Sequence, residues 1–135
     1  MTIVTTSRKP VPEIRSLAKD LAFAIGCTYV LRGKMGLSEL NSKYPVFFLL
    51  SLEQGNFRMK LIDDDSVIAD YRVDVQEVTT RSAVRMEGLF VSNQSVYEEL
   101  KPYIPVKLTE EPSGALMFDG TRKKRYVLNL TAYGA

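Results

Sequence analysis

The sequence predicts an α/β fold in which two similar small halves pack as one unit. Short β-prone runs alternate with amphipathic helical segments, the same kinds of segment recur in a shortened order after residue 82, and no flexible linker separates the two parts. We expect one domain over residues 1–135, with one half at about residues 1–78 and the other at about residues 83–135. A chain of 135 residues can bury a single core of ordinary size.

The first half is predicted to run strand, helix, strand and short helix, followed by a three-stranded meander. A β-prone run at residues 2–6 precedes Pro12, which suits a first helical position, and apolar residues spaced three and four apart continue to Gly26. Arg15 and Lys19 lie off this apolar stripe and are expected in solvent, whereas Leu17 and Leu21 are expected in the core. The later segments are a strand at 27–31, a helical turn at 36–41, strands at 46–52, 57–62 and 67–75, and an aspartate turn at 63–65. The continuous apolar run at 46–52 predicts a strand that is covered on both faces.

The second half repeats the order of strand, helix, strand and hairpin. Residues 85–91 predict a strand weakened by Gly88, and the capping-box spacing of Ser95 and Glu98 predicts a short helix that ends at Leu100. An edge strand is expected at 103–108, a loop at 110–114, and a hairpin of residues 115–118 and 124–133 around Asp119-Gly120. A structural duplication of the first half is therefore a hypothesis that the pattern suggests.

The net charge of +2 hides an uneven distribution of charge along the chain. Residues 1–35 hold six lysines and arginines against two acidic residues, and residues 121–135 hold four basic residues and no acidic one. The segment between them has eight basic and fourteen acidic residues. Two basic ends on an acidic body are typical of a protein that binds a polyanion, provided that the fold brings the ends together.

The basic residues near the N-terminus follow two predicted neighbouring strands. Arg8 and Lys9 lie between the first strand and the helix, and Arg32 and Lys34 follow the second strand. Parallel strands joined through a helix end at the same edge of a sheet, so we expect these four side chains to share one surface. Free N–H groups and the helix dipole also favour negative charge at this edge.

The residue content excludes several kinds of catalytic site. The chain has no histidine, which removes Ser-His-Asp and Cys-His pairs, and its single Cys27 cannot build a disulfide or a structural zinc site. It also has no Gly-rich dinucleotide fingerprint and no P-loop. We interpret the aspartates at 63–65 as a solvated turn rather than a cation site, and we expect no enzyme, no metal and no cofactor.

The composition favours a cytoplasmic protein. No apolar run approaches the roughly 20 residues of a membrane span. Arg8 and Lys9 interrupt the N-terminal segment before the apolar region of a signal peptide could form. A lone cysteine suits a reducing compartment. We therefore expect no membrane partner.

A combination of short motifs marks the first forty residues. It begins with Thr5-Thr6-Ser7-Arg8-Lys9-Pro10 and continues through Arg15-Ser16, Lys19-Asp20-Leu21 and Tyr29 to Arg32-Gly33-Lys34-Met35. In this combination the chain resembles the Brix domain family, and most of all the small stand-alone archaeal Brix proteins. The resemblance implies two α/β halves, each like the anticodon-binding domain of class II aminoacyl-tRNA synthetases. It also implies a role in ribosome assembly, in which some relatives bind ribosomal or small nucleolar RNA.

The sequence thus predicts a non-catalytic RNA-binding factor of ribosome biogenesis that assists the folding or processing of rRNA. The expected partners are rRNA, pre-rRNA or an associated guide RNA, together with ribosomal or processing proteins. Exposed aromatic residues are sparse in the basic loops, so we expect contacts with phosphates and RNA shape. Two other functions stay open, a protein–protein assembly module without RNA contact and a tRNA-related anticodon-binding module. The candidate RNA-binding residues are Ser7, Arg8, Lys9, Arg15, Lys19, Arg32, Lys34, Arg122, Lys123, Lys124 and Arg125.

Overall fold

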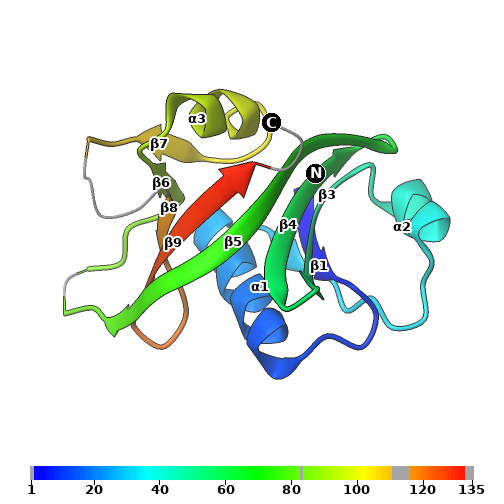
Figure 1. Ribbon diagram of the computed structural model, residues 1–135, viewed down its shortest axis with the longest axis horizontal. Coiled ribbons are helices and arrows are strands. Elements are labelled where there is room, and N and C mark those ends of the chain that lie inside the picture. Colours follow the sequence, from blue (N-terminus) through cyan, green and yellow to red (C-terminus); the bar gives the residue numbers. More distant parts are fainter. Residues whose placement is uncertain (1, 83, 111–115, 133–135) are drawn as a thin grey trace.

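The computed structural model describes residues 2–82, 84–110 and 116–132, and these form an α/β fold on one mixed sheet (Figure 1). Over the described residues, nine strands lie in the order β2-β1-β3-β4-β5-β9-β8-β6-β7. Figure 1 shows α1 behind the sheet, α2 beyond one side of it and α3 at the top. The predicted α/β class is therefore confirmed. The likeness of each half to an anticodon-binding domain stays a prediction.

The first half begins with a parallel strand–helix–strand unit. It consists of β1 (Thr2–Thr6), α1 (Pro12–Ile25) and β2 (Thr28–Tyr29), and β1 lies parallel to β2 on one side and to β3 on the other. Pro12 opens α1 as predicted, and Gly26 ends it in the left-handed conformation, with φ of 69°. The short helix α2 (Leu37–Lys43) connects this unit to the next strand.

The predicted meander is present. β3 (Val46–Glu53), β4 (Asn56–Asp63) and β5 (Ser66–Thr80) pair as antiparallel neighbours. Of the three aspartates predicted to form a turn, Asp63 ends β4, and Asp64 and Asp65 form the turn to β5. β5 is longer than predicted, because residues 79–80, which were expected in the connection between the halves, continue its pairing with β9.

The second half joins the same sheet. It comprises β6 (Leu89–Val91), α3 (Gln94–Leu100), β7 (Val106–Leu108), β8 (Leu116–Asp119) and β9 (Lys124–Ala132). β6 is parallel to β7, whereas β6, β8 and β9 pair in antiparallel fashion. The pairing of β9 with β5 makes the two halves one sheet, which agrees with the predicted packing as one unit.

Three predicted strands are shorter than expected, two of them for a local reason. Only Thr28 and Tyr29 of the strand predicted at 27–31 pair in register with β1. The strand predicted at 85–91 begins at residue 89, because Gly88 adopts a φ of 84° and turns the chain. The edge strand predicted at 103–108 begins at residue 106, since the N–H groups of Tyr103 and Ile104 bond back to the carbonyl of Leu100.

Two predicted local signals have different roles from those expected. The N-cap of α3 is Asn93, whose side chain accepts from the N–H groups of Ser95 and Val96, so the capping box predicted at Ser95 is wrong. Asp119-Gly120 precedes the hairpin turn rather than forming it, because Arg122 and Lys123 are the residues with positive φ. Most of the loop predicted at 110–114, together with residues 115 and 133 of the predicted hairpin, lies outside the described residues.

The core lies on both faces of the first half of the sheet. α1 buries Leu17 and Leu21 against the face that also receives side chains of α3 and β8. On the opposite face, Leu40 of α2 packs in a smaller cluster with Phe47 of β3. β3 is therefore covered on both faces, as predicted. None of the described helices is both long and apolar enough to span a membrane.

The register of α1 can be tested by two substitutions. Leu21→Ala should lower the free energy of unfolding by about 2–5 kcal/mol, because it removes a buried side chain and leaves a cavity. Arg15→Ala should change it little, since Arg15 is exposed. Urea unfolding of both variants measures the difference, and equally mild effects would show that the helix register is wrong.

Candidate functional site

The two basic loops of the first half meet at one edge of the sheet. The loop between β1 and α1 carries Arg8 and Lys9, and the loop between β2 and α2 carries Arg32 and Lys34. Both loops follow the carboxyl ends of the parallel strands β1 and β2. The Arg32 guanidinium lies close enough to Arg8 for the two charges to interact, which confirms the prediction that the loops share one surface.

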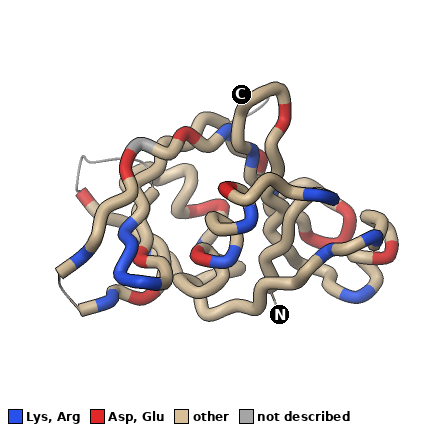
Figure 2. Tube along the Cα trace, turned by 90° about the horizontal axis from the view of Figure 1, so that it is seen from below, with Lys and Arg blue, Asp and Glu red and all other residues tan. Residues whose placement is uncertain are grey.

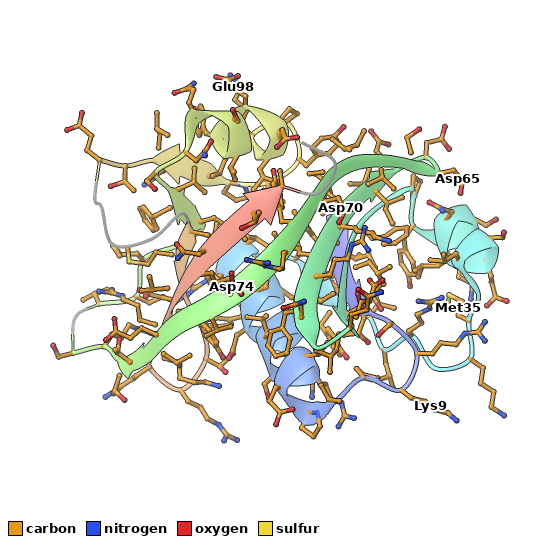
Figure 3. The ribbon with its side chains drawn as sticks, viewed as in Figure 1. Lys9, Met35, Asp65, Asp70, Asp74 and Glu98 are labelled. Atoms are coloured by element: carbon orange, nitrogen blue, oxygen red, sulfur yellow. The ribbon has the colours of Figure 1, made fainter. Side chains whose placement is uncertain are left out.

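A groove of about 500 Å³ lies between these loops and the outer side of α1. We name it the basic groove; its lining residues are Thr6, Ser7, Lys9, Pro10, Arg15, Lys19, Leu31, Arg32, Gly33 and Lys34. Six of the eleven predicted RNA-binding residues are among them. Arg8 is not a lining residue; its guanidinium lies next to Gly36, where an added Cβ would be 3.5 Å from its Nη2. Figure 3 places Lys9 at the lower edge of the molecule and Glu98 of α3 at the upper edge.

The Arg32-Gly33-Lys34-Met35 motif forms a tight turn that fixes Arg32. The N–H of Met35 donates to the carbonyl of Arg32 at 3.2 Å, and Gly33 supplies a φ of 58°. In return, Nε of Arg32 donates to the Met35 carbonyl at 2.9 Å, and Nη1 lies 3.5 Å from the carbonyl of Thr6. The guanidinium is therefore held across the end of β1 before any ligand binds.

The cations of this surface form no ion pair with the acidic side chains that the structure describes. Among the described residues, no carboxylate oxygen lies within 4 Å of the charged atoms of Arg8, Lys9, Arg15, Lys19, Arg32 or Lys34. Burial, and after it the nearby charge of Arg8, lowers the pKa of Arg32. A partly buried cation beside a second cation is stabilised when an anion binds between them.

The hairpin between β8 and β9 brings further positive charge to the same side of α1. A smaller groove of about 230 Å³ is lined by Ser16, Lys19, Asp20, Thr121, Arg122 and Lys124. Lys19 lines both grooves, so the two basic ends of the chain meet at this residue. Seen from below in Figure 2, Lys and Arg segments are spread across this side of the molecule, with acidic segments among them.

The four basic residues of the hairpin differ in their surroundings. Arg122 and Lys123 are exposed. Lys124 pairs with Asp20, with 2.9 Å between Nζ and Oδ2, and Arg125 pairs with Asp119 through two hydrogen bonds of 2.7 and 3.1 Å. Arg122 and Lys123 are therefore the hairpin cations best placed to reach a ligand, whereas Lys124 and Arg125 are engaged within the protein.

Asp20 connects α1 to the hairpin. This side chain is only 2% exposed, and it accepts hydrogen bonds from the backbone N–H of Thr121 at 2.9 Å, from the Thr121 hydroxyl at 2.5 Å and from the Tyr126 hydroxyl. Burial alone would raise the pKa of Asp20, but the bonds from Thr121, Tyr126 and Lys124 outweigh it and hold this pKa below its usual value. We call this set of contacts the Asp20 clamp.

Gly120 allows the close packing of the Asp20 clamp. A Cβ at this position would lie 2.8 Å from Cβ and Cγ of Asp20 and 2.9 Å from a ring carbon of Tyr126. Sequence analysis did not identify the clamp, because its partners lie about a hundred residues apart. The one local signal was an acidic residue adjacent to the apolar stripe of α1.

The fold and the grooves define an α/β protein with a basic surface at the carboxyl ends of its parallel strands. No protein-family model matches the chain. It is 28% identical over 108 residues to a "Probable Brix domain-containing ribosomal biogenesis protein" of Methanococcoides burtonii, across 80% of this chain and 59% of that protein. A protein of the same name from Archaeoglobus fulgidus is 41% identical over 56 residues, which cover 42% of this chain and 37% of that protein. The resemblance to archaeal Brix proteins is therefore confirmed, and the chain spans about 59% and 37% of the lengths of these relatives.

Solved structures show the same fold. Mil, an archaeal Imp4-like protein, superposes with a TM-score of 0.65 at 19% identity, over 96% of this chain and 99% of its own. A probable ribosomal biogenesis protein from Aeropyrum pernix gives a TM-score of 0.58 at 18% identity, over 95% and 94% of the two chains. At these identities the likeness establishes the fold alone.

The Asp20 clamp predicts a pH dependence of stability. Because the folded pKa of Asp20 lies below its unfolded value of about 3.9, its contribution is fully present above that value and is lost as the pH falls through the folded pKa. At pH 7, Asp20→Asn should lower the free energy of unfolding by about 1–3 kcal/mol, because Asn cannot pair with Lys124. Urea unfolding between pH 7 and pH 3 should show this difference shrinking below about pH 4. A difference that is constant across this range would contradict the assigned role of the carboxylate.

Proposed function

We propose that the protein binds RNA phosphates through the basic groove and the adjoining hairpin, as a non-catalytic factor of ribosome biogenesis. The observation that carries the proposal is a set of cations around one groove that pair with no carboxylate in residues 2–82, 84–110 and 116–132, with Arg32 held by its bond to Met35. Contacts with backbone phosphates supply much of the affinity of protein–nucleic acid complexes. These contacts are made mainly by positively charged side chains. The groove contributes cations and small hydroxyls, which suit binding rather than catalysis.

The names of the relatives support the biological setting of this proposal. Both curated relatives are named ribosomal biogenesis proteins, so we propose rRNA or pre-rRNA, or a guide RNA associated with it, as the ligand. Assistance with rRNA folding or processing and a cytoplasmic location are parts of the same proposal. Ribosomal or processing proteins would then be neighbours in the assembling particle.

A second candidate function rests on a separate apolar groove. This groove, of about 460 Å³, lies between the start of α1 and strands β4, β5 and β9, and includes Phe57, Val75 and Val78. A bulge in β5 between Val75 and Glu77 shifts its register against β9 at this groove. An apolar groove of this kind favours a protein-docking module of pre-ribosome particles, which would not need RNA contact.

RNA binding through phosphates predicts a strong dependence of affinity on salt. With about five or six phosphate contacts, a plot of log K against log salt should have a slope of roughly −3 to −5. Changing Arg8 and Lys9 together to Ala should reduce the magnitude of this slope by between one and two, and equally for unrelated RNA sequences. Fluorescence anisotropy with a structured rRNA fragment at several salt concentrations measures both values.

A control for total charge comes from the opposite side of the molecule. Changing Lys101 and Lys107 together to Ala also removes two positive charges, at the end of α3 and in β7, and it should leave the slope nearly unchanged. An equal effect of the two double variants would mean that binding reflects net charge rather than the basic groove. No RNA binding by the folded protein at low salt would reject the proposed function in favour of protein docking.

The hairpin between β8 and β9 should contribute to RNA binding separately from the basic groove. Because Arg122 and Lys123 are exposed and Arg122 shares a groove with Lys19, changing both hairpin residues to Ala should reduce the salt slope by about one to two. Combined with the Arg8 and Lys9 changes, the two reductions should add, since the sites are distinct. Salt titration of the combined variant tests this, and an unchanged slope after the hairpin change alone would restrict the interface to the basic groove.

A further inference from the structure

We propose that the basic groove takes an unpaired segment of RNA, with a base lying on Leu31, in preference to a duplex. This inference rests on the proposed RNA binding and specifies which form of RNA the site recognises. Three observations carry it: the concave shape of the site, the exposed apolar side chain within it, and the cations that line it from separate segments of the chain.

The first observation is the shape and size of the groove. Its volume of about 500 Å³ is that of a site for a small molecule or a few linked groups. A duplex is a wide rod with its bases stacked inside, so it could touch only the rim of such a groove. An unpaired strand can instead turn a base into the groove while its phosphates stay at the rim.

The second observation is Leu31, which lines the groove and is 73% exposed. An aliphatic side chain gives no stabilisation to a phosphate, and its exposure to water is unfavourable in the free protein. A base laid on Leu31, with Pro10 also in the lining, would remove this apolar surface from water. Because such a contact makes no hydrogen bond to a base edge, it would carry little sequence preference.

The third observation is that cations from separate segments of the chain line the groove. Lys9 comes from the loop before α1, Arg15 and Lys19 come from α1 itself, and Arg32 and Lys34 come from the loop after β2. Successive phosphates of one strand that passes through the groove would meet a cation on either side of the inserted base. The fixed guanidinium of Arg32 then defines where one of these phosphates sits.

The test compares two forms of one RNA. A short labelled oligonucleotide of mixed sequence is titrated by anisotropy, once unpaired and once annealed to its complement, and both forms are measured at the same series of salt concentrations. The wild-type protein should bind the unpaired form about fivefold to tenfold more tightly. Leu31→Ala should remove most of that preference while leaving the duplex affinity and the salt slope unchanged, because no charge is altered.

Leu37→Ala provides the matched control, since Leu37 is also exposed, at 48%, near these loops, but does not line the groove. It should bind both RNA forms as the wild type does. Leu31→Lys should raise the duplex affinity through its added charge while it lowers the preference for the unpaired form. Thermal melts confirm that each variant is folded.

Two results would overturn the inference. Equal or tighter binding of the duplex by the wild type, or an undiminished preference after Leu31→Ala, would place the bases elsewhere while RNA binding itself would stand. No binding of either form at low salt would reject the proposed function and this inference with it. The two failures are therefore distinguishable in the same titration.

Discussion

The arrangement of the basic groove and the adjoining hairpin depends on one buried carboxylate, Asp20. Its hydrogen bonds to Thr121 and Tyr126, together with its ion pair with Lys124, fix the β8–β9 hairpin of the second half onto the helix of the first. Strand pairing joins the halves through β5 and β9 along the sheet, but the clamp orients the hairpin loop relative to α1. The groove that Lys19 shares with Arg122 exists because these two elements are held together at this point.

The position of this carboxylate also determines which charges remain available. A buried negative charge within a basic face costs desolvation, and paired hydrogen bonds offset that cost. Asp20 neutralises Lys124, and Asp119 similarly engages Arg125 and the N–H of Met86. The two internal pairs thus separate the structural cations of the hairpin from the exposed ones, which a count of basic residues in the sequence cannot do.

Local sequence patterns predicted most elements of the fold, because apolar periodicity and Gly or Pro positions act within a few residues. Pro12 and Gly26 placed the ends of α1 correctly, and the common edge of two parallel strands placed the cations of both loops on one surface. Strand ends in the second half were less predictable. They depend on backbone contacts such as that of Gly88 with Ala24, and no local pattern encodes the partners of Asp20 a hundred residues away.

The backbone is strained at three of the basic residues in these loops. Lys9, Arg122 and Lys123 have φ values of 51°, 56° and 58°, a region in which glycine or asparagine would be less strained. Such strain persists only where the surrounding structure fixes the chain. In the hairpin, Arg81 supplies that support by donating to the carbonyls of Gly120 and Lys124, beside the Asp20 clamp. Arg122 lines the smaller groove beside the Asp20 clamp, so the contacts that support this strained turn also fix the place of Arg122 at that groove.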